Sequence, residues 1–323
     1  MASSRRIGAG ADEVAVAGAA INRSTRWAAV VVNHNAGELL VEAVRSLLGD
    51  VGAGGPPEVV VVDNESTDGS VDSLLAAGVD VRVVRSPGNV GYARGANLGI
   101  AACRAPVVAV LNPDAEIEPG TAAALLERLD REPDLGAVGP RILNFDGTDY
   151  PSARSLPSVV DAAGHGVLGL FWPTNPFTRR YRHLDADPDR SRDVDWVSGA
   201  AVWLRRDALD DVGGWDERYF MYMEDLDLCW RLRRSGWRVA YEPAGRVTHV
   251  QGVSASRRPY RMILEHHRSA WRFTRRRYTG VKRILLPAAA VYLAFRCSAA
   301  WLEHAVHGCT AGRRSRGSLR GHG

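Results

Sequence analysis

Short apolar strands alternate with helices four times between residues 27 and 111, and this alternation is the strongest constraint on the fold. The strands are β-rich, apolar runs at 27–33, 58–63, 81–85 and 106–111. Helical patterns lie between them at 37–48, 70–77 and 91–103. Such regular spacing requires a parallel sheet with helices on both faces. We therefore predict an α/β fold with a mostly parallel central sheet.

The chain after this region continues with further regular elements around one long irregular insert. We predict a helix at 121–130 and strands at 137–143, 195–204, 237–241 and 246–250. Residues 144–194 are rich in proline and polar residues and carry no periodic pattern. Loops of this length in a compact domain are usually functional, so we interpret the insert as a lid or an acceptor-binding segment.

Polar and acidic residues follow two of the predicted strands at their carboxyl ends. Asp63 and Asn64 follow one strand, and Asn112-Pro113-Asp114 follows another. Ligands of open α/β sheets bind at this edge. A single aspartate there is as often a helix cap as a ligand, but two such clusters favour a site. Asp114 with a histidine such as His249 suits a hard divalent cation that chelates a diphosphate, although a lone histidine is more often structural.

The segment 213–236 places carboxylates directly behind a run of aromatic and methionine side chains. It reads GGWDERYFMYMEDLDLCWRLRRSG. Acids in the first turn and bases in the last turn agree with the helix dipole, so a capped amphipathic helix is one interpretation. The other is catalytic, because desolvation raises the pKa of a carboxylate toward values at which it acts as a base.

Two common nucleotide motifs are missing from the expected positions. The first strand is followed by neither a G-x-G-x-x-G nor a G-x-x-x-x-G-K-[ST] sequence, so dinucleotide and P-loop binding are unsupported. The glycine-rich run at 88–99 opens a helix, and a helix N-terminus can face a phosphate. The carboxylates and the histidine together indicate chemistry on a nucleoside diphosphate.

Six motifs in order resemble the family 2 glycosyltransferases, which have the GT-A (Rossmann-like) nucleotide-diphospho-sugar transferase fold. The motifs are VVVNHNAGELL (30–40), VVVVDNESTDGS (59–70), GNVGYARGANLG (88–99), LNPDAEI (111–117), VSGAAVWLRRDAL (197–209) and GGWDERYFMYMEDLDLCWRL (213–232). Within that family the chain resembles the rhamnosyltransferases. The insert at 150–182 is similar to that of actinobacterial enzymes that add L-rhamnose to decaprenyl-diphospho-GlcNAc, the start of the linker between arabinogalactan and peptidoglycan.

The resemblance implies a role for each matching residue. Asp63 would bind the pyrimidine of dTDP, and Arg94 would contact the diphosphate. The other implied nucleotide and donor residues are Asn33, Asn35, Asn89, Asn97 and Asn112. Asp114 matches the last position of a D-x-D motif whose first aspartate is here Asn112, and His249 would complete a Mg²⁺ or Mn²⁺ site. Asp225 matches the general base. The implied acceptor-side and sugar-side residues are Trp196, Ser198, Gly199, Tyr222 and Glu224.

These roles describe an inverting transfer of L-rhamnose from dTDP-L-rhamnose to the 3-hydroxyl of GlcNAc in a polyprenyl-diphospho-GlcNAc lipid. A second hypothesis within the family is a hexosyl or galactofuranosyl transferase that uses a UDP-sugar. A third hypothesis, of another class, is a catalytically silent module that binds membrane or nucleic acid. Retention of Asp63, Asp114, Asp225 and His249 argues against the silent module, so we expect no nucleic-acid partner.

The ends of the chain differ in composition from its middle. We expect a disordered leader at 1–25 without a secretory signal, a catalytic domain at 26–256, a basic and amphipathic helical extension at 257–311 and a disordered basic tail at 312–323. The extension suits a membrane surface, although packing on the core is an equal alternative. No unbroken apolar run of about 18 residues is present, so we do not expect a simple spanning helix. The four cysteines are scattered, which favours a reducing cytoplasm. We expect a cytoplasmic protein, peripheral on the inner face of the plasma membrane.

Overall fold

The computed structural model describes residues 25–318 with short gaps. The gaps are 52–53, 157–160, 162–163, 165–167, 169–170, 173, 183 and 251–258, and only the backbone is described at 306–318. The chain divides into two compact units, one formed by residues up to Phe220 with Glu224–Ser254, the other by Met221–Met223 with residues from Ala255 onward. Residues 1–24 of the leader predicted at 1–25, and the predicted boundary after residue 256, lie outside the described residues.

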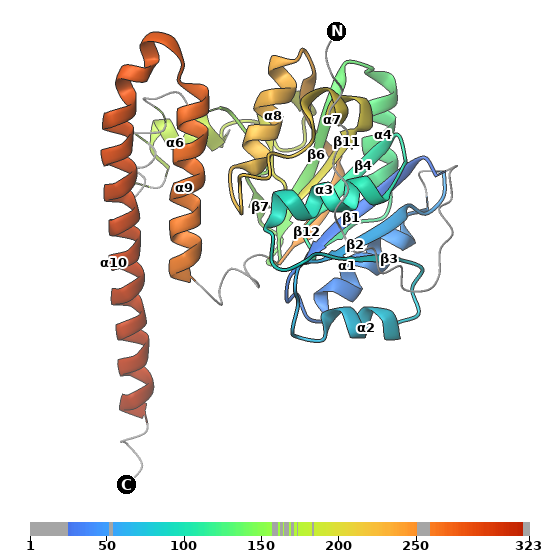
Figure 1. Ribbon diagram of the computed structural model, residues 1–323, viewed down its shortest axis with the longest axis horizontal. Coiled ribbons are helices and arrows are strands. Elements are labelled where there is room, and N and C mark those ends of the chain that lie inside the picture. The colour runs from blue at the N-terminus through green and yellow to red at the C-terminus, as the bar shows by residue number, and fades with distance from the viewer. Residues whose placement is uncertain are drawn as a thin grey trace. The chain divides into compact units, whose positions relative to one another are not determined.

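The first unit is built on one large mixed sheet (Figure 1). Its strands are β1 (Trp27–Asn33), β2 (Glu58–Asp63), β3 (Arg82–Arg85), β4 (Val107–Leu111), β5 (Ala115–Ile117), β6 (Leu135–Asn144), β7 (Asp149–Tyr150), β9 (Arg192–Asp193), β11 (Ala201–Arg205) and β12 (Arg238–His249). The main order is β3-β2-β1-β4-β11-β6-β12-β5. The first four run parallel, β11 enters antiparallel between β4 and β6, and β6 and β12 are parallel again.

A two-stranded ribbon and seven described helices complete the first unit. The ribbon pairs β8 (Ala153–Arg154) with β10 (Trp196–Val197). The helices are α1 (Leu39–Gly49), α2 (Ser70–Ala76), α3 (Tyr92–Ala102), α4 (Thr121–Arg131), α6 (Pro176–Arg182), α7 (Arg206–Val212) and α8 (Glu224–Arg234). The predicted α/β fold of GT-A type with a mostly parallel sheet and flanking helices is confirmed.

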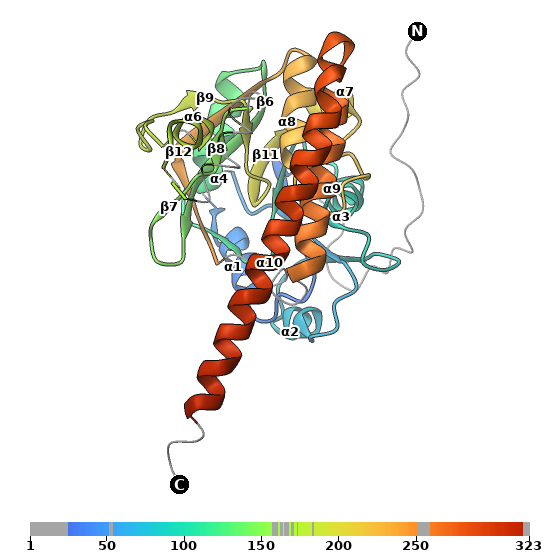
Figure 2. The same ribbon diagram turned by 90° about the vertical axis from the view of Figure 1, so that its left-hand side faces the viewer.

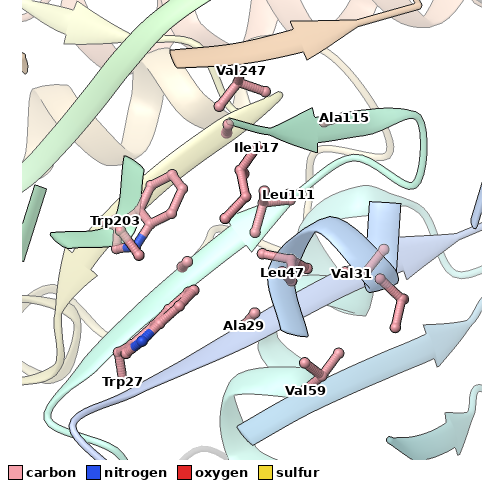
Figure 3. Packing of buried hydrophobic residues seen from close by; sticks show 14 of the residues in the cluster. Trp27, Ala29, Val31, Leu47, Val59, Leu111, Ala115, Ile117, Trp203 and Val247 are labelled. Carbon is pink, nitrogen blue, oxygen red and sulfur yellow. The ribbon is translucent and has the colours of Figure 1, made fainter. Parts of the chain in front are cut away.

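Both faces of the central strands are buried, as parallel strands between two helix layers require. On one face, Trp27 packs against Trp203 with ring centroids 6.0 Å apart, within a cluster that includes side chains of α1 and α4 (Figure 3). On the other face, α3 approaches so closely that a Cβ at Gly99 would lie 2.2 Å from Val30. Glycine at this position therefore allows α3 to lie directly on the sheet.

Two strand predictions need correction. The stretch 195–204 is not one strand: β10 pairs with β8, and β11 joins the main sheet after a break at residues 198–200. Conversely, 237–241 and 246–250 are parts of one strand, β12, whose register shifts between Glu242 and Arg246. Pro243 lies within that shift and has no N–H for the ladder, which explains why the pattern looked like two strands.

The second unit contains an antiparallel helical hairpin (Figures 1 and 2). Helix α9 (Pro259–Arg277) leads through the 3₁₀ turn η3 (Gly280–Leu285) into α10 (Leu286–Ser318). The ring of Tyr260 lies 5.0 Å from the ring centroids of both Trp301 and His304. Helix α10 continues through Ser318, so the range 312–318, predicted to be disordered, is helical. Arginine is a good helix former, and its charge is favourable near a helix C-terminus.

One segment of this unit, Gly280–Ala305, is long and apolar enough to cross a membrane, judged by length and composition. Its best window has a mean hydropathy of 1.5, and none of that window is buried. By length and composition this segment is therefore a candidate span, although we expected no simple spanning helix from the absence of an unbroken apolar run. Arg296 interrupts the apolar run without lowering its average below that of a membrane segment.

Candidate active site

The first three predicted nucleotide residues lie at the carboxyl ends of β1 and β2. Asn33 and Asp63 are register partners on these adjacent parallel strands. The buried Asn33 amide donates hydrogen bonds to the hydroxyls of Ser66 (3.0 Å) and Ser70 (2.9 Å). Asn35 has a positive φ of 58° and accepts a backbone N–H from the same loop at 2.8 Å. Asn33 and Asn35 thus hold the β2–α2 loop against the end of β1.

Asp63 has one carboxylate oxygen fixed and one more accessible. Its Oδ1 accepts the backbone N–H of Ser66 at 3.1 Å, while Oδ2 lies 3.4 Å from the guanidinium of Arg85, which is 47% exposed. The neighbouring Asn64 accepts the backbone N–H of Val90 at 2.9 Å and donates to the Asn89 side chain at 3.3 Å. The predicted residues Asp63 and Asn89 therefore belong to one rim, joined by Asn64, which the sequence placed at the same strand end without a specific role.

Arg94 and Asn97 on α3 face the segment that precedes α8. The Asn97 amide donates to the Trp215 carbonyl at 2.9 Å and accepts the Trp215 N–H at 2.9 Å. It also donates to Glu217 at 3.0 Å, and Arg94 lies 3.8 Å from the same carboxylate. Asn97 is therefore engaged in fixing this segment. The half-exposed Arg94 has a long ion pair that a diphosphate could replace.

The predicted metal residues converge although 135 residues separate them in the chain. His249 Nε2 lies 3.1 Å from Asp114 Oδ1 and 3.1 Å from the Asn112 side-chain amide. Asp114 lies between β4 and β5, directly before the first residue of β5. Because β5 pairs with the end of β12, Asp114 lies next to His249. All three side chains are at most partly exposed, and Asp114 and His249 are buried.

This donor set fits a divalent cation that also binds phosphate oxygens. A carboxylate, an amide and an imidazole provide too few ligands for a cage made of protein alone, and Mg²⁺ commonly combines one or two carboxylates with substrate phosphates. Within the described residues, no group of three or more His, Cys, Asp and Glu side chains forms a metal site. His249 Nδ1 is buried and has no hydrogen-bond partner in the described part of the chain, which leaves this imidazole free to adjust its tautomer.

Asp225 is held at the N-terminus of α8 by two backbone donors. Its Oδ2 accepts the N–H of Gly199 at 2.9 Å, and its Oδ1 accepts the N–H of Leu226 at 2.8 Å. Burial raises the pKa of Asp225, and the two N–H donors and the charge of Arg154 oppose this rise. Gly199 is needed for the contact, since a Cβ there would lie 3.1 Å from the Asp225 Cβ. The carboxylate is thus both fixed and partly desolvated.

Tyr92 connects the base region with the metal residues, and the sequence prediction did not include it. Its hydroxyl donates to the Gly199 carbonyl at 2.6 Å. Its pKa is raised well above the ordinary value, first by burial and then by the charges of Glu224, Asp225 and Asp114. The carboxylates at the two predicted sites therefore act electrostatically on the same buried phenol. Glu224 itself is buried, and burial followed by the charge of Asp225 raises its pKa strongly.

The remaining predicted residues belong to different parts of the structure. Trp196 and Ser198 are buried on the chain that leads to Gly199, and the Trp196 indole donates to a backbone carbonyl at 3.1 Å. Tyr222 belongs to the second unit, where its ring lies 5.4 Å from that of His266. Its role beside the acceptor stays a prediction. Asp227 is structural: fully buried, it bonds the guanidinium of Arg231 at 2.7 Å.

Sequence reasoning missed Tyr92 and Arg154 here, and it named Asn64 at a strand end without giving it a role. Asn64 and Tyr92 lie inside motifs already quoted, so their positions were available but their partners were not. Arg154 lies in the proline-rich insert, where no periodicity marks it. Only the pairing of β8 with β10 brings it next to the site.

A comparison with family models assigns the chain. The model described as "Glycosyl transferase family 2" matches residues 28–213, more than half of the sequence. The chain belongs to glycosyl transferase family 2. The matched range includes Asp63, Asp114 and Gly199 and ends before Asp225.

Curated relatives within this family include glycosyltransferases of mycobacteria. The chain is 40% identical over 236 residues to the N-acetylglucosaminyl-diphospho-decaprenol L-rhamnosyltransferase of Mycobacterium tuberculosis (strain ATCC 25618 / H37Rv), covering 70% of this chain and 76% of that protein. It is 33% identical over 191 residues to the pre-mycofactocin glycosyltransferase of the same strain, covering 59% of this chain and 37% of the relative. The resemblance to the rhamnosyltransferases is thereby confirmed, and the protein is a glycosyltransferase.

Solved structures of related fold agree with this assignment. A mannosyltransferase from Pyrobaculum calidifontis in complex with GDP-Man and Mn²⁺ aligns with a TM-score of 0.52 at 17% identity, covering 97% of this chain and 84% of that one. GalNAc-T7 with UDP, GalNAc and Mn²⁺ aligns with a TM-score of 0.53 at 16% identity, covering 70% and 44%. At these identities the likeness shows the fold alone.

Proposed function

We propose that this glycosyltransferase moves L-rhamnose from dTDP-L-rhamnose to the 3-hydroxyl of GlcNAc in a polyprenyl-diphospho-GlcNAc lipid, with inversion, in the synthesis of the arabinogalactan linker. One observation carries the proposal that it is a catalyst: the partly buried Asp225 carboxylate has two backbone donors and a raised pKa, and its charge and that of Asp114 both act on Tyr92. The mycobacterial relative supports the choice of donor and acceptor.

The chemistry assigned to Asp225 follows from its surroundings. As the acceptor hydroxyl attacks the anomeric carbon, an O–C bond forms, the bond from that carbon to dTDP breaks, and the hydroxyl proton passes to Asp225. A carboxylate with a raised pKa binds this proton more strongly than one in water does. The N–H groups of Gly199 and Leu226 keep it aimed while the proton moves. Asp63 and Asn89 would line the nucleoside end, and Arg94 the diphosphate.

Asp114 and His249, assisted by Asn112, are the residues that would hold Mg²⁺ or Mn²⁺. Such an ion, when bound, supplies positive charge that stabilises a departing nucleoside diphosphate. Because the described residues provide only two strong protein ligands here, we expect binding of the ion to depend on the nucleotide. Titration calorimetry should show Mn²⁺ binding in the presence of dTDP and almost none without it. Equal affinity for Mn²⁺ with and without dTDP would contradict this assignment.

The second unit suits a lipid-linked acceptor at the cytoplasmic face of the plasma membrane. Helix α9 ends in three arginines, Arg275, Arg276 and Arg277, and Gly280–Ala305 is apolar and unburied. Arginine can bind anionic headgroups while an apolar helix face enters the bilayer. The proposed partners are therefore the nucleotide sugar, the polyprenyl lipid and the membrane surface.

The decisive experiment combines purified protein, dTDP-L-rhamnose, a polyprenyl-diphospho-GlcNAc acceptor and Asp225→Asn. We expect transfer by the wild type and a loss of about 10²–10⁴-fold in the variant, with dTDP affinity unchanged, since the substitution removes the base alone. Near-normal activity of the variant would refute the role of Asp225. Transfer from a UDP-sugar instead of dTDP-L-rhamnose would keep the class and reject the donor. Binding without transfer from any nucleotide sugar would favour the silent module.

A further inference from the structure

Arg154 lies among three aromatic rings beside the proposed base. It is the last residue of β8 and the register partner of Trp196 in β10. Its guanidinium carbon is 4.9 Å from the Trp196 ring centroid, 5.3 Å from that of Tyr150 and 5.9 Å from that of Tyr181. Aromatic faces stabilise a cation without neutralising it.

The hydrogen bonds of Arg154 are also made to neutral groups. Its Nε donates to the Pro151 carbonyl at 2.6 Å, and one terminal nitrogen donates to the Tyr150 hydroxyl at 2.9 Å. The Tyr181 side chain is a further hydrogen-bond partner. A partly buried cation with such partners keeps its full charge and exerts a stronger field than one exposed to water.

The backbone pairs Arg154 with the segment that leads to a hydrogen-bond donor of Asp225. The chain continues from Trp196, the partner of Arg154, to Gly199, whose N–H donates to Asp225 Oδ2 at 2.9 Å. The interaction is visible from both residues: the charge of Arg154 lowers the pKa of Asp225, and the charge of Asp225 raises that of Arg154.

We propose that Arg154 is a positioning residue whose positive charge, with the N–H donors of Gly199 and Leu226, keeps the partly buried Asp225 ionised and able to accept the proton of the acceptor hydroxyl. This inference rests on the proposed function, in which Asp225 is the base. Nothing in the reaction requires Arg154 to touch the substrate. Its contribution is to keep a desolvated carboxylate in the charged form that a base needs.

The other titratable groups around Asp225 cannot take over this task. On α8, burial raises the pKa of the Cys229 thiol to about 12, so it stays neutral. On α3, Tyr92 stays neutral for the same reason. Glu224 is an acid, so any charge on it would oppose ionisation of its neighbour. Among the charged side chains in the described part of the chain, Arg154 is therefore the one shown to favour the carboxylate, together with the N–H donors of Gly199 and Leu226.

The test is the pH dependence of kcat/KM for rhamnosyl transfer by the full chain. In Arg154→Gln we expect the acidic limb of the pH profile of kcat/KM to move to higher pH by about one unit. This is the lower end of the range by which a nearby opposite charge shifts the pKa of a carboxylate. Activity should fall at low pH and recover at high pH. Arg154→Lys should retain the wild-type limb. Arg192→Gln is the matched control, because Arg192 lies 4.5 Å from the Tyr241 ring and belongs to another strand; its limb should not move.

A second pair of variants covers the case in which Arg154→Gln does not fold. Tyr181→Glu would place a carboxylate against Arg154 and neutralise its charge, while Tyr181→Gln would keep the charge. We expect the limb to move only in the glutamate variant. An unmoved limb in Arg154→Gln or Tyr181→Glu would overturn this inference, provided that Asp225→Asn is inactive. If Asp225→Asn is active, the proposed base itself is wrong.

Discussion

At the scale of single residues, two adjacent carboxylates differ in what they contribute. Asp225 has two backbone donors, whereas Glu224 is buried with its Oε2 lacking a hydrogen-bond partner among the described residues. An unpaired buried carboxyl group is costly to the fold when it is charged. Proteins tolerate this loss of stability where the carboxyl group contributes to a reaction. Function and stability then make opposite demands on one residue.

Glu224→Gln should therefore stabilise the protein at neutral pH. The pKa of Glu224 is raised in the folded state. Below the ordinary carboxyl pKa of about 4, both states are protonated and the substitution changes little. As the pH rises from there toward the raised pKa, the unfolded state releases its proton first, and stability is lost. We expect the variant's Tm to exceed that of the wild type by about 2–4 °C at pH 7.

Thermal denaturation between pH 4 and pH 7.5 measures this difference. The gain in Tm should shrink as the pH falls toward 4. A glutamine variant that is less stable than the wild type at pH 7 would contradict the prediction. Glu116→Gln is a milder control, because partial burial raises the pKa of Glu116 without enclosing it.

At the scale of elements, helix α3 connects the rim that contains Asp63 and Asn89 with the segment that precedes the proposed base, Asp225. Gly91 precedes this helix, and the Tyr92 N–H donates to the Phe220 carbonyl at 2.8 Å. A Cβ at Gly91 would lie 2.5 Å from that carbonyl oxygen. The glycine-rich motif at 88–99 thus serves close approach of two backbone segments, whatever else it contacts.

Gly91→Ala should destabilise the fold more than Gly120→Ala. The two glycines share nearly the same positive φ, 87° and 86°, but ψ is 172° at Gly91 and −5° at Gly120. Nothing lies within 4 Å of a Cβ at Gly120. Gly120→Ala should cost about 1–2 kcal/mol from left-handed backbone strain alone. Gly91→Ala should cost about 1–3 kcal/mol more, because its φ and ψ are open almost to glycine alone and because it adds an overpacked contact. Urea denaturation of both variants gives the comparison; equal losses would contradict both reasons.

At the scale of the whole molecule, the second unit exposes apolar side chains along one helix. The first unit buries most of its apolar residues between helices and sheet, whereas α10 exposes Val291 (71%) and Phe295 (63%). An unburied apolar helix next to an arginine-rich one has the composition of a membrane-binding surface, which is the role we propose for it. This arrangement accords with a lipid-linked acceptor.

A double substitution, Val291→Glu with Phe295→Glu, should release the protein from anionic lipid vesicles. We expect its vesicle-bound fraction in sedimentation to fall several-fold, since each glutamate adds charge to a surface that enters the bilayer. The control is Val51→Glu with Phe145→Glu, two residues of the first unit that are 61% and 80% exposed. Equal binding by both double variants would exclude α10 as the membrane surface.

The sequence by itself determined the layered α/β fold, because the pattern of apolar residues distinguishes each buried strand from each amphipathic helix within a few residues. It also placed Asp63 and Asn112–Asp114 at strand ends, since parallel strands share one carboxyl edge. The tertiary structure alone decided which distant groups meet. Tyr92 reaches Gly199 across 107 residues, and His249 reaches Asp114 across 135. Arg154 approaches Asp225 only because β8 pairs with β10. Such contacts depend on strand pairing and chain reversal, which leave no local pattern in the sequence, and they decide which of several acids can act as the base.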